Sequence, residues 1–327
     1  MPSLAHHAPN SRAVSVWAGS LPAREPQNRR RERGMAQRCT AFEAAGTVSH
    51  PGAALAKSRT MRGGGTMRAS RFWCGMVLAA MVAASAAAAP RGDAGRGAKL
   101  ATVLGCHDCH GAGLTGKPVI DDPTIAKLNS SNLTRAVPRY TDRELARVLQ
   151  RGVRPDGSHL WYMDAAPYAV MSPADLRDLI AYLRSVPPEG ADQPRLVIGP
   201  RMLKAVQAGR FKPESATLAH DLAHPPFDGG PRLARGRYLA RTACAGCHTP
   251  SLGGVKDPQA GDPPDLNVAA AYSQAEFRTM MRAGKGPGDR DLGDMTKAVQ
   301  ARFAAMPIAD VDALHDYLSA RAKAAGQ

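Results

Sequence analysis

Residues 104–111 read LGCHDCHG and place two cysteines and two histidines within positions 106–110. Three kinds of site contain a Cys-x-x-Cys pair. A structural zinc site needs further ligands at a matching spacing. A thiol redox couple lies between a strand and a helix and needs no histidine after its second cysteine. Covalent attachment of haem does need that histidine, because the imidazole that follows Cys109 then lies beneath the iron.

The pentapeptide at 106–110 has a second copy, because residues 244–248 read CAGCH. From Pro90 onward the chain has four cysteines, and all of them belong to the two copies: Cys106, Cys109, Cys244 and Cys247. Disulfides, or a zinc ion with four thiolates, would use these cysteines but leave the histidine after each pair without a role. We therefore predict two covalently bound haem c groups, with His110 and His248 as axial ligands of the two irons.

The segment upstream of the first motif has the features of an export signal. Residues 67–88 begin with two arginines, carry no charge from Phe72 onward and end in small residues, as secretory signal peptides do. We expect cleavage after Ala88 and a periplasmic location; an uncleaved membrane anchor is the alternative. Residues 1–66 contain the run RRRERG and show no sustained periodicity. They are predicted to be a disordered leader upstream of the true translation start.

The basic charge of the chain is concentrated in that leader. The full sequence has a formal net charge of +15, whereas the part from Pro90 onward has 31 Lys and Arg against 25 Asp and Glu, a net charge of +6. A large basic excess is typical of proteins that bind nucleic acid. The smaller charge after Pro90 therefore predicts no nucleic-acid partner.

The repeat extends beyond the two motifs. Residues 140–152, YTDRELARVLQRG, match residues 272–284, YSQAEFRTMMRAG, at one constant offset and without a gap. A tyrosine, a glutamate and a glycine are identical in the two segments. DLRDLIAYL at 175–183 matches DVDALHDYL at 310–318 with a slightly larger offset. Two homologous modules of about 90 residues each follow, a size that suits a domain with a single core.

The repeat divides the chain into two predicted domains, 89–188 and 231–327, joined by a linker at 189–230. The linker is rich in Pro, Gly and basic residues, and one helix is predicted within it at 201–210. It is too long for a simple hinge, so we expect it to pack against one of the domains.

Each domain has the periodicity of short helices. In 141–152 apolar residues recur at helical spacing, and Thr141 can cap the start and Gly152 the end. In 172–186 Ser172 can cap a helix that has one apolar face. Shorter helices are predicted ahead of the motifs, at 96–105 and 234–243, and His315 is expected on the polar side of the last helix. No segment alternates over strand length, so the predicted fold class is all-α.

With two such motifs on helical domains, the chain resembles the c-type cytochrome family. NLT at 132–134, GVRPDG at 152–157 and YAVMSPADLRDLIAYLRSVPP at 168–188 are similar to the cytochrome c subunits of periplasmic and membrane-bound dehydrogenases. The resemblance implies two tandem helical domains of the class I cytochrome c type. It also implies a proline carbonyl that orients each haem histidine, with Pro118 and the prolines at 263–264 as candidates.

The resemblance implies a methionine as the sixth ligand of each iron, and the repeat indicates which ones. Met163 and Met295 follow the glycine that the modules share at the same distance along the chain, so we predict these two. Met171 and Met306 also correspond, directly ahead of the last helices, where apolar side chains pack. Met306 remains the alternative for the second haem because it precedes a proline, and His159 is the alternative for the first.

These features predict a periplasmic dihaem cytochrome that transfers single electrons between a dehydrogenase or quinol-oxidising complex and a terminal acceptor. Expected partners are redox proteins such as a dehydrogenase, a terminal oxidase or another cytochrome, with membrane association through a partner or an uncleaved anchor. We predict an electron carrier without catalytic residues. The alternative is a dihaem peroxidase, which needs two inequivalent irons. The similar subunits often have Met-Pro where this chain has Met163-Asp164, and often carry three haems.

Overall fold

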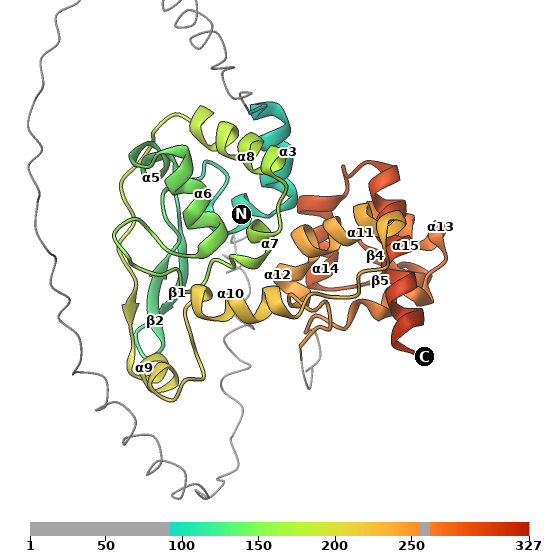
Figure 1. The fold of residues 1–327 in the computed structure, drawn as a ribbon. Helices are drawn as coiled ribbons and strands as arrows, with labels where there is room; N and C mark the ends of the chain where they lie inside the picture. The colour runs from blue at the N-terminus through green and yellow to red at the C-terminus, as the bar shows by residue number, and fades with distance from the viewer. Residues whose placement is uncertain (1–91, 256–261, 327) are drawn as a thin grey trace, which may run out of the picture. The chain divides into compact units, whose positions relative to one another are not determined.

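The computed structural model describes residues 92–255 and 262–326. The predictions for residues 1–66 and for the signal at 67–88 lie outside the described residues. Most described residues are helical and the strands are short, so the predicted all-α fold is confirmed (Figure 1). The helices form two modules that follow one another along the chain, each with its own apolar core.

The first module is built on two crossing helices, α3 (Ala94–Val103) and α8 (Pro173–Ser185). The first motif forms the short helix α4 (Cys106–His110), directly after α3 in the chain. The other elements lie between α4 and α8: β1 (Pro118–Asp122), β2 (Ala126–Asn129), α5 (Leu133–Ala136), η1 (Val137–Arg139), α6 (Asp142–Arg151) and α7 (Ala166–Ala169). Apolar side chains of α3, α6 and α8 form its core.

The second module repeats this plan. Helix α11 (Ala234–Leu239) crosses α15 (Ile308–Ala325), and the second motif ends in α12 (Ala245–His248). The other elements are η2 (Pro231–Leu233), η3 (Ala240–Cys244), η4 (Leu266–Ala271), α13 (Gln274–Ala283), β4 (Lys285–Gly286), η5 (Pro287–Asp289), β5 (Arg290–Asp291), α14 (Asp294–Ala298) and η6 (Val299–Phe303). Both η3 and η6 are π-helical, a form that usually appears as a single turn inserted in an α-helix.

A glycine allows the first and last helices of each module to touch through their backbones. A Cβ atom on Gly97 of α3 would lie 1.9 Å from the carbonyl oxygen of Asp178 in α8. A Cβ atom on Gly236 of α11 would lie 1.9 Å from the carbonyl oxygen of Ala313 in α15. Any larger residue at either position would push the two helices apart. The same close crossing is therefore present in both modules.

The helix boundaries predicted from the repeat are confirmed at matched positions. Thr141 caps α6 and Ser273 caps α13, each within a capping box, and the αL residues Gly152 and Gly284 end these helices. The Ser172 hydroxyl accepts a hydrogen bond from an amide in the first turn of α8. These local signals fix where the helices between the motifs and the methionines begin and end.

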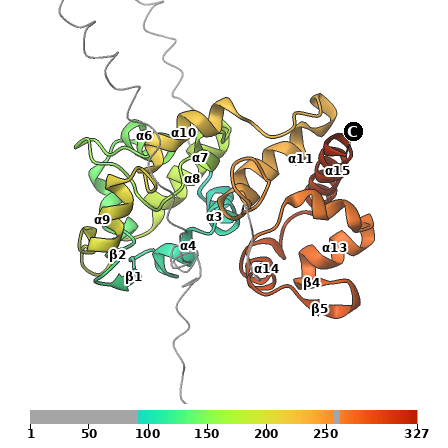
Figure 2. The ribbon, with the colours of Figure 1, turned by 90° about the horizontal axis from the view of Figure 1, so that it is seen from below.

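The segment between the modules packs against the first one. Its strand β3 (Val197–Ile198) adds to β2 to give a three-stranded antiparallel sheet with the order β1-β2-β3. Helix α9 (Pro200–Gln207) lies beside β1 and β2, with Met202 in a small core shared with Ile120 (Figure 2). Helix α10 (Glu214–Ala223) packs through Leu218 on α7.

One histidine lies elsewhere than the sequence indicates. His315, predicted on the polar side of the last helix, is only 8% exposed. Its ring packs against Phe277 of α13, with 4.8 Å between the ring centroids, and its Nε2 lies 2.9 Å from the carbonyl oxygen of Tyr272. The burial is possible because the polar nitrogen is satisfied by this backbone carbonyl.

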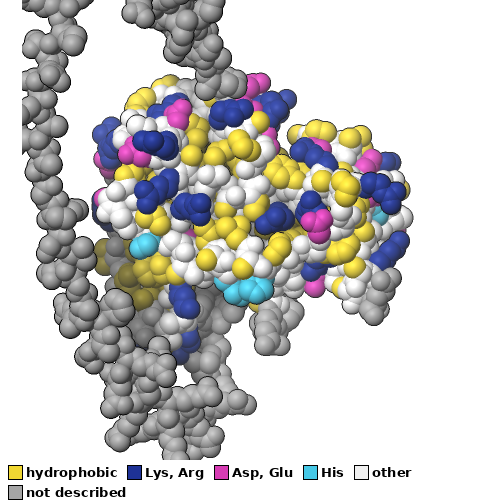
Figure 3. Space-filling view, in the orientation of Figure 1, with side chains coloured by type: hydrophobic (Ala, Val, Ile, Leu, Met, Phe, Trp, Pro, Cys, Tyr) yellow, Lys and Arg dark blue, Asp and Glu magenta, His cyan; other side chains and the backbone are white. Residues whose placement is uncertain are grey.

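The surface drawn in Figure 3 mixes charged and apolar side chains. Lysine and arginine side chains are scattered over this face among acidic, apolar and other residues, without a single large basic area. Within residues 92–255 and 262–326, no helix is both long enough and apolar enough to cross a membrane.

Candidate haem-binding sites

The first motif presents a buried histidine with one free ring nitrogen. Helix α4 begins after Gly105, whose φ of 71° is the left-handed conformation that glycine adopts at low cost. Cys106 and His110 are buried, whereas Cys109 is exposed. The Nδ1 atom of His110 lies 2.7 Å from the carbonyl oxygen of Ser131. A carbonyl only accepts, so Nδ1 carries the proton and Nε2 keeps a lone pair for an iron atom.

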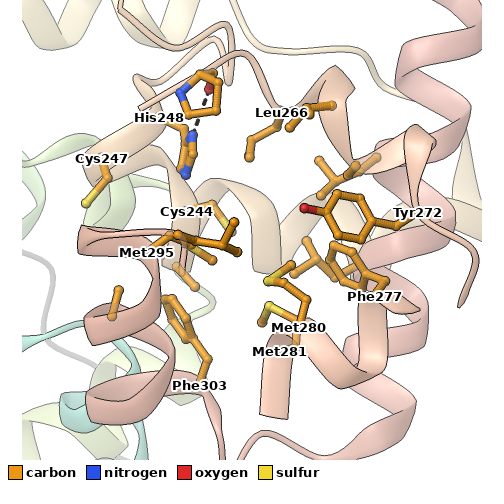
Figure 4. A pocket seen from close by; sticks show the side chains of 18 of the residues that line it. Cys244, Cys247, His248, Leu266, Tyr272, Phe277, Met280, Met281, Met295 and Phe303 are labelled. Atoms are coloured by element: carbon orange, nitrogen blue, oxygen red, sulfur yellow. Dashed lines mark hydrogen bonds between the residues drawn. The ribbon is translucent and has the colours of Figure 1, made fainter. Parts of the chain in front are cut away.

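The second motif repeats this arrangement. His248 is 8% exposed, and its Nδ1 donates to the carbonyl oxygen of Pro264 over 2.8 Å, the hydrogen bond drawn in Figure 4. Burial lowers the pKa of both His110 and His248, which favours the neutral imidazole that an iron atom requires. The two histidines therefore have the same tautomer, the same kind of backbone partner and the same protonation state.

The predicted proline at the first site was wrong. Pro118 begins β1 and pairs with Asn129, whereas the carbonyl that holds His110 belongs to Ser131. For the second site, where two prolines were candidates, the structure identifies Pro264. Ser131 therefore takes in the first module the place that Pro264 has in the second. The role needs only a backbone carbonyl, so proline is not required there.

The loops after the two motifs have matching backbones. The amides of Gly116 and Gly254 donate to the carbonyls of His110 and His248, at 2.8 Å and 3.0 Å. Leu114 and Leu252 are both buried at positive φ, 58° and 63°, and accept hydrogen bonds from Leu133 and Leu266 respectively. Leu133 and Leu266 each lie two positions after the residue whose carbonyl holds the haem histidine, Ser131 or Pro264. Aligning NLT (132–134) with DLN (265–267) would have identified Ser131 from the sequence.

A cavity opens beside the second motif helix. The empty space between its walls, including the part that is open to solvent, is about 1040 Å³. The walls are mostly apolar, as in most cofactor sites, and come from η4, α13, α14, η6 and α15. Four of the predicted site residues line it together: Cys244, Cys247, His248 and Met295 (Figure 4). A flat, apolar group joined to two thiols, with a nitrogen and a sulfur ligand for its metal, fits this donor set.

The two candidate methionines of the second module occupy different places. Met295 lines the cavity, whereas Met306 is buried in the core and is not one of the lining residues. Met280 and Met281 of α13 also line the cavity, which the sequence reasoning did not anticipate. In the first module, the repeat places Val148 and Leu149 at the positions equivalent to Met280 and Met281. If Met280 or Met281 bound the second iron, the first module would have no matching ligand.

In the first module, three of the residues named from the sequence lie around one core: Cys106, Met163 and Met171. Met163 is partly buried and packs against the apolar cluster that contains Cys106 and Met171. Met171 is only 5% exposed, directly ahead of α8, where it was predicted to pack. The alternative ligand His159 lies with its Nδ1 2.7 Å from the Ser215 hydroxyl, at the start of α10.

The first thiol of each motif, on Cys106 and Cys244, has the character of an unionised group held away from water. All four described cysteines are unpaired. Burial raises the pKa of Cys106 to about 11 and that of Cys244 to about 12. A redox couple or a metal-binding pair works through thiolates with lowered pKa values, so these environments disfavour the thiol-couple interpretation. Among the described residues, no group of three or more His, Cys, Asp or Glu is placed to hold a metal ion.

Comparison with known proteins gives similar cytochrome subunits. The chain is 26% identical over 267 residues to the fructose dehydrogenase cytochrome subunit of Gluconobacter japonicus, covering 71% of this chain and 53% of that protein. It is 27% identical over 261 residues to a diheme cytochrome c-type protein of Cereibacter sphaeroides, covering 69% and 85%. It is 29% identical over 164 residues to the cytochrome c subunit of a quinone alcohol dehydrogenase from Gluconacetobacter polyoxogenes, covering 47% and 34%. The chain thus spans about half the length of the fructose dehydrogenase subunit.

The family model for cytochrome c matches two segments, residues 94–187 and 233–321, which together make up more than half of the chain. Each segment contains one motif helix, its loop and the crossing pair of helices. Covalently bound haem c is the cofactor that this family implies. On the repeated geometry and this match, the chain belongs to the cytochrome c family.

Proposed function

We propose that this chain is an exported dihaem electron carrier that passes single electrons from a dehydrogenase to an acceptor protein. The observation that carries the proposal is the repeated motif helix. In both copies, a backbone carbonyl fixes the histidine so that its Nε2 is available to iron. Haem supplies one-electron chemistry between the ferric and ferrous states.

Each module would hold one haem with four of its residues. Cys106 and Cys109, or Cys244 and Cys247, form the thioether bonds, and the histidine after each pair binds the iron. Met163 and Met295 are the proposed second axial ligands. The support for Met295 is its place in the wall of the same cavity as His248.

The other residues control the environment of the iron. The carbonyls of Ser131 and Pro264 hold the imidazole rings in one orientation. Apolar side chains, such as Phe277 and Phe303 in the second module, exclude water from the cavity. An apolar wall disfavours the more positive ferric state, so these apolar side chains would raise the reduction potential.

The partners and the location are part of the same proposal. The fructose and alcohol dehydrogenase proteins named above are cytochrome subunits of dehydrogenases, which supports a dehydrogenase as the electron donor. The signal-like segment at 67–88 supports a periplasmic location. The matched histidines and methionines favour two irons with the same pair of ligands, whereas a peroxidase needs two irons that differ in ligation.

Mass spectrometry tests the cofactor. Protein produced with its export segment, in a host that attaches haem c, should gain the mass of two haems and keep them through acid–acetone extraction. The double variant Cys106→Ala, Cys109→Ala should lose one haem, and the matched variant Cys244→Ala, Cys247→Ala should lose the other. Extractable haem, or zinc in stoichiometric amount, would contradict the proposal.

A further inference from the structure

A partly buried ion pair joins the first motif to the wall of the second cavity. Arg302 lies in η6 and lines that cavity together with Cys247 and Met295. Its guanidinium pairs with the carboxylate of Asp108, which lies between the two cysteines of the first motif. The side chains are 21% and 36% exposed, so water screens the pair only in part.

The guanidinium of Arg302 lies against the backbone that precedes the first motif. A Cβ atom on Gly105 would lie 2.3 Å from the guanidinium carbon of Arg302. The cation therefore lies directly beside the glycine before Cys106. Val103 of α3 packs nearby against the core of the second module.

The two ends of this ion pair are placed differently relative to the two sites. The anion is part of the first motif. The cation also lies against that motif, where Asp108 offsets its charge, and it lines the cavity of the second site, as Arg290 does. The second motif has no acidic residue of this kind, because Gly246 stands where the first motif has Asp108. The other acid at the contact, Asp164, follows Met163 and lies 4.0 Å from a Cβ atom built on Gly246. It therefore acts on both sites and does not distinguish them.

We infer that the Arg302–Asp108 pair sets the order of the two reduction potentials, with the second haem site the higher. A nearby cation disfavours the ferric state and raises a potential, whereas a nearby anion lowers it. A chain that has accepted one electron from its donor would then hold that electron mainly at the second site, and the first site would stay ferric. This inference rests on the proposed function, because it requires two haems.

Potentiometric titration of the holoprotein tests the charge assignment. Arg302→Gln should lower mainly the second potential, and Asp108→Asn should raise mainly the first. Each change should shift the one-electron equilibrium between the sites by up to about tenfold, which corresponds to about 59 mV. Both variants should bring the two potentials closer together, narrowing the gap between them, Arg302→Gln by lowering the second and Asp108→Asn by raising the first. If the contact served packing alone, the two variants would shift the potentials in the same direction.

Two further variants separate charge from packing. Arg302→Lys keeps the cation but loses the planar fork, so the gap should stay close to that of the wild type. Arg278→Gln removes a cation from another ion pair of the second module, formed with Asp312, and should leave the gap unchanged. The first-site wave is the one that survives in the double variant Cys244→Ala, Cys247→Ala. Met295→His, which should lower only the second wave, gives an independent assignment.

The outcomes are distinct. The inference is supported if Arg302→Gln lowers the second potential, Asp108→Asn raises the first, and Arg302→Lys keeps the difference between the two potentials close to that of the wild type. It is overturned if both variants shift the potentials in one direction, if neither exceeds Arg278→Gln, or if the first site has the higher potential in the wild type. A chain that binds fewer than two haems would instead contradict the proposed function.

Discussion

The two modules match closely from the capped helices α6 and α13 to the methionines and differ immediately after them. The stretch from Met295 to Met306 is longer than the equivalent stretch from Met163 to Met171. The first module fills this interval with the short helix α7, the second with α14 and the π-helical η6. Arg302, which reaches the first motif, lies in η6. The shared parts are those that would hold the haem, and the part that differs builds the contact between the sites.

The largest expected effect comes from removing the proposed methionine ligand from one of the two sites. Replacing Met163 or Met295 with alanine should remove about half of the weak near-infrared band of ferric iron bound by methionine sulfur, since each methionine serves one of two irons. The same change should lower that site's potential and open its iron to carbon monoxide. Absorption spectroscopy of the oxidised protein and carbon monoxide titration of the reduced protein measure these changes.

The other methionines are the controls for this assignment. Met171→Ala and Met306→Ala should leave the band intact and destabilise the fold by about 2–5 kcal/mol, because both side chains are buried. Met280→Leu and Met281→Leu should also leave it intact. If Met306→Ala weakens the band and Met295→Ala does not, the constant offset of the repeat does not identify the second ligand. A wild type without the band that binds peroxide readily would favour a peroxidase.

The next effect tests whether the helix crossings are equivalent. Gly97→Ala and Gly236→Ala each place a methyl group against a carbonyl oxygen, and each should destabilise its own module by about 3 kcal/mol. Differential scanning calorimetry should show one transition lowered in each variant. In the control Gly113→Ala, the new Cβ atom meets nothing closer than 3.6 Å, so both transitions should stay in place. A variant that lowers both transitions equally would mean that the modules unfold together.

These comparisons also show what the sequence could and could not predict. The capping residues, and the cysteines and histidines proposed for haem, could be predicted because their roles depend on side-chain chemistry and the same residue types recur in both copies. The Ser131 carbonyl was missed because a backbone group can come from any residue. The pair of Arg302 and Asp108 joins positions 194 residues apart, and nothing local in either segment indicates the partner.

A smaller effect concerns the linker, which packs on the first module. Burial, with smaller contributions from Asp164 and Asp221, raises the pKa of Glu214 to about 7. A raised pKa means that the folded state holds the proton more tightly than the unfolded chain. The associated stability is present at pH 4 and lost as the pH rises through about 7. Glu214→Gln should therefore stabilise the protein at pH 8 by about 1–2 kcal/mol, allowing for partial solvent screening.

Urea unfolding at pH 4, 6 and 8 measures this difference. The stability of Glu214→Gln relative to the wild type should grow with pH. Glu189→Gln, at an exposed glutamate of the same linker, should show no such trend. An advantage of Glu214→Gln that is the same at all three pH values would exclude titration of this carboxyl as its cause.

The smallest effect is the most direct measure of how alike the modules are. Thr141 accepts a hydrogen bond from the Glu144 amide at 3.2 Å, and Ser273 accepts one from the Glu276 amide at 3.3 Å. In both boxes the glutamate accepts a 2.8 Å hydrogen bond from the capping residue's amide. Thr141→Ala and Ser273→Ala should therefore each cost about 1 kcal/mol. The amide and hydroxyl of Thr141 lower the pKa of Glu144, and the hydroxyl and amide of Ser273 lower the pKa of Glu276, by donating hydrogen bonds to these carboxylates. The glutamate contribution is therefore lost as the pH falls, and both costs should shrink in acid. Unequal costs at neutral pH would show that the surroundings of α6 and α13, and not the caps, set the stability of these helices.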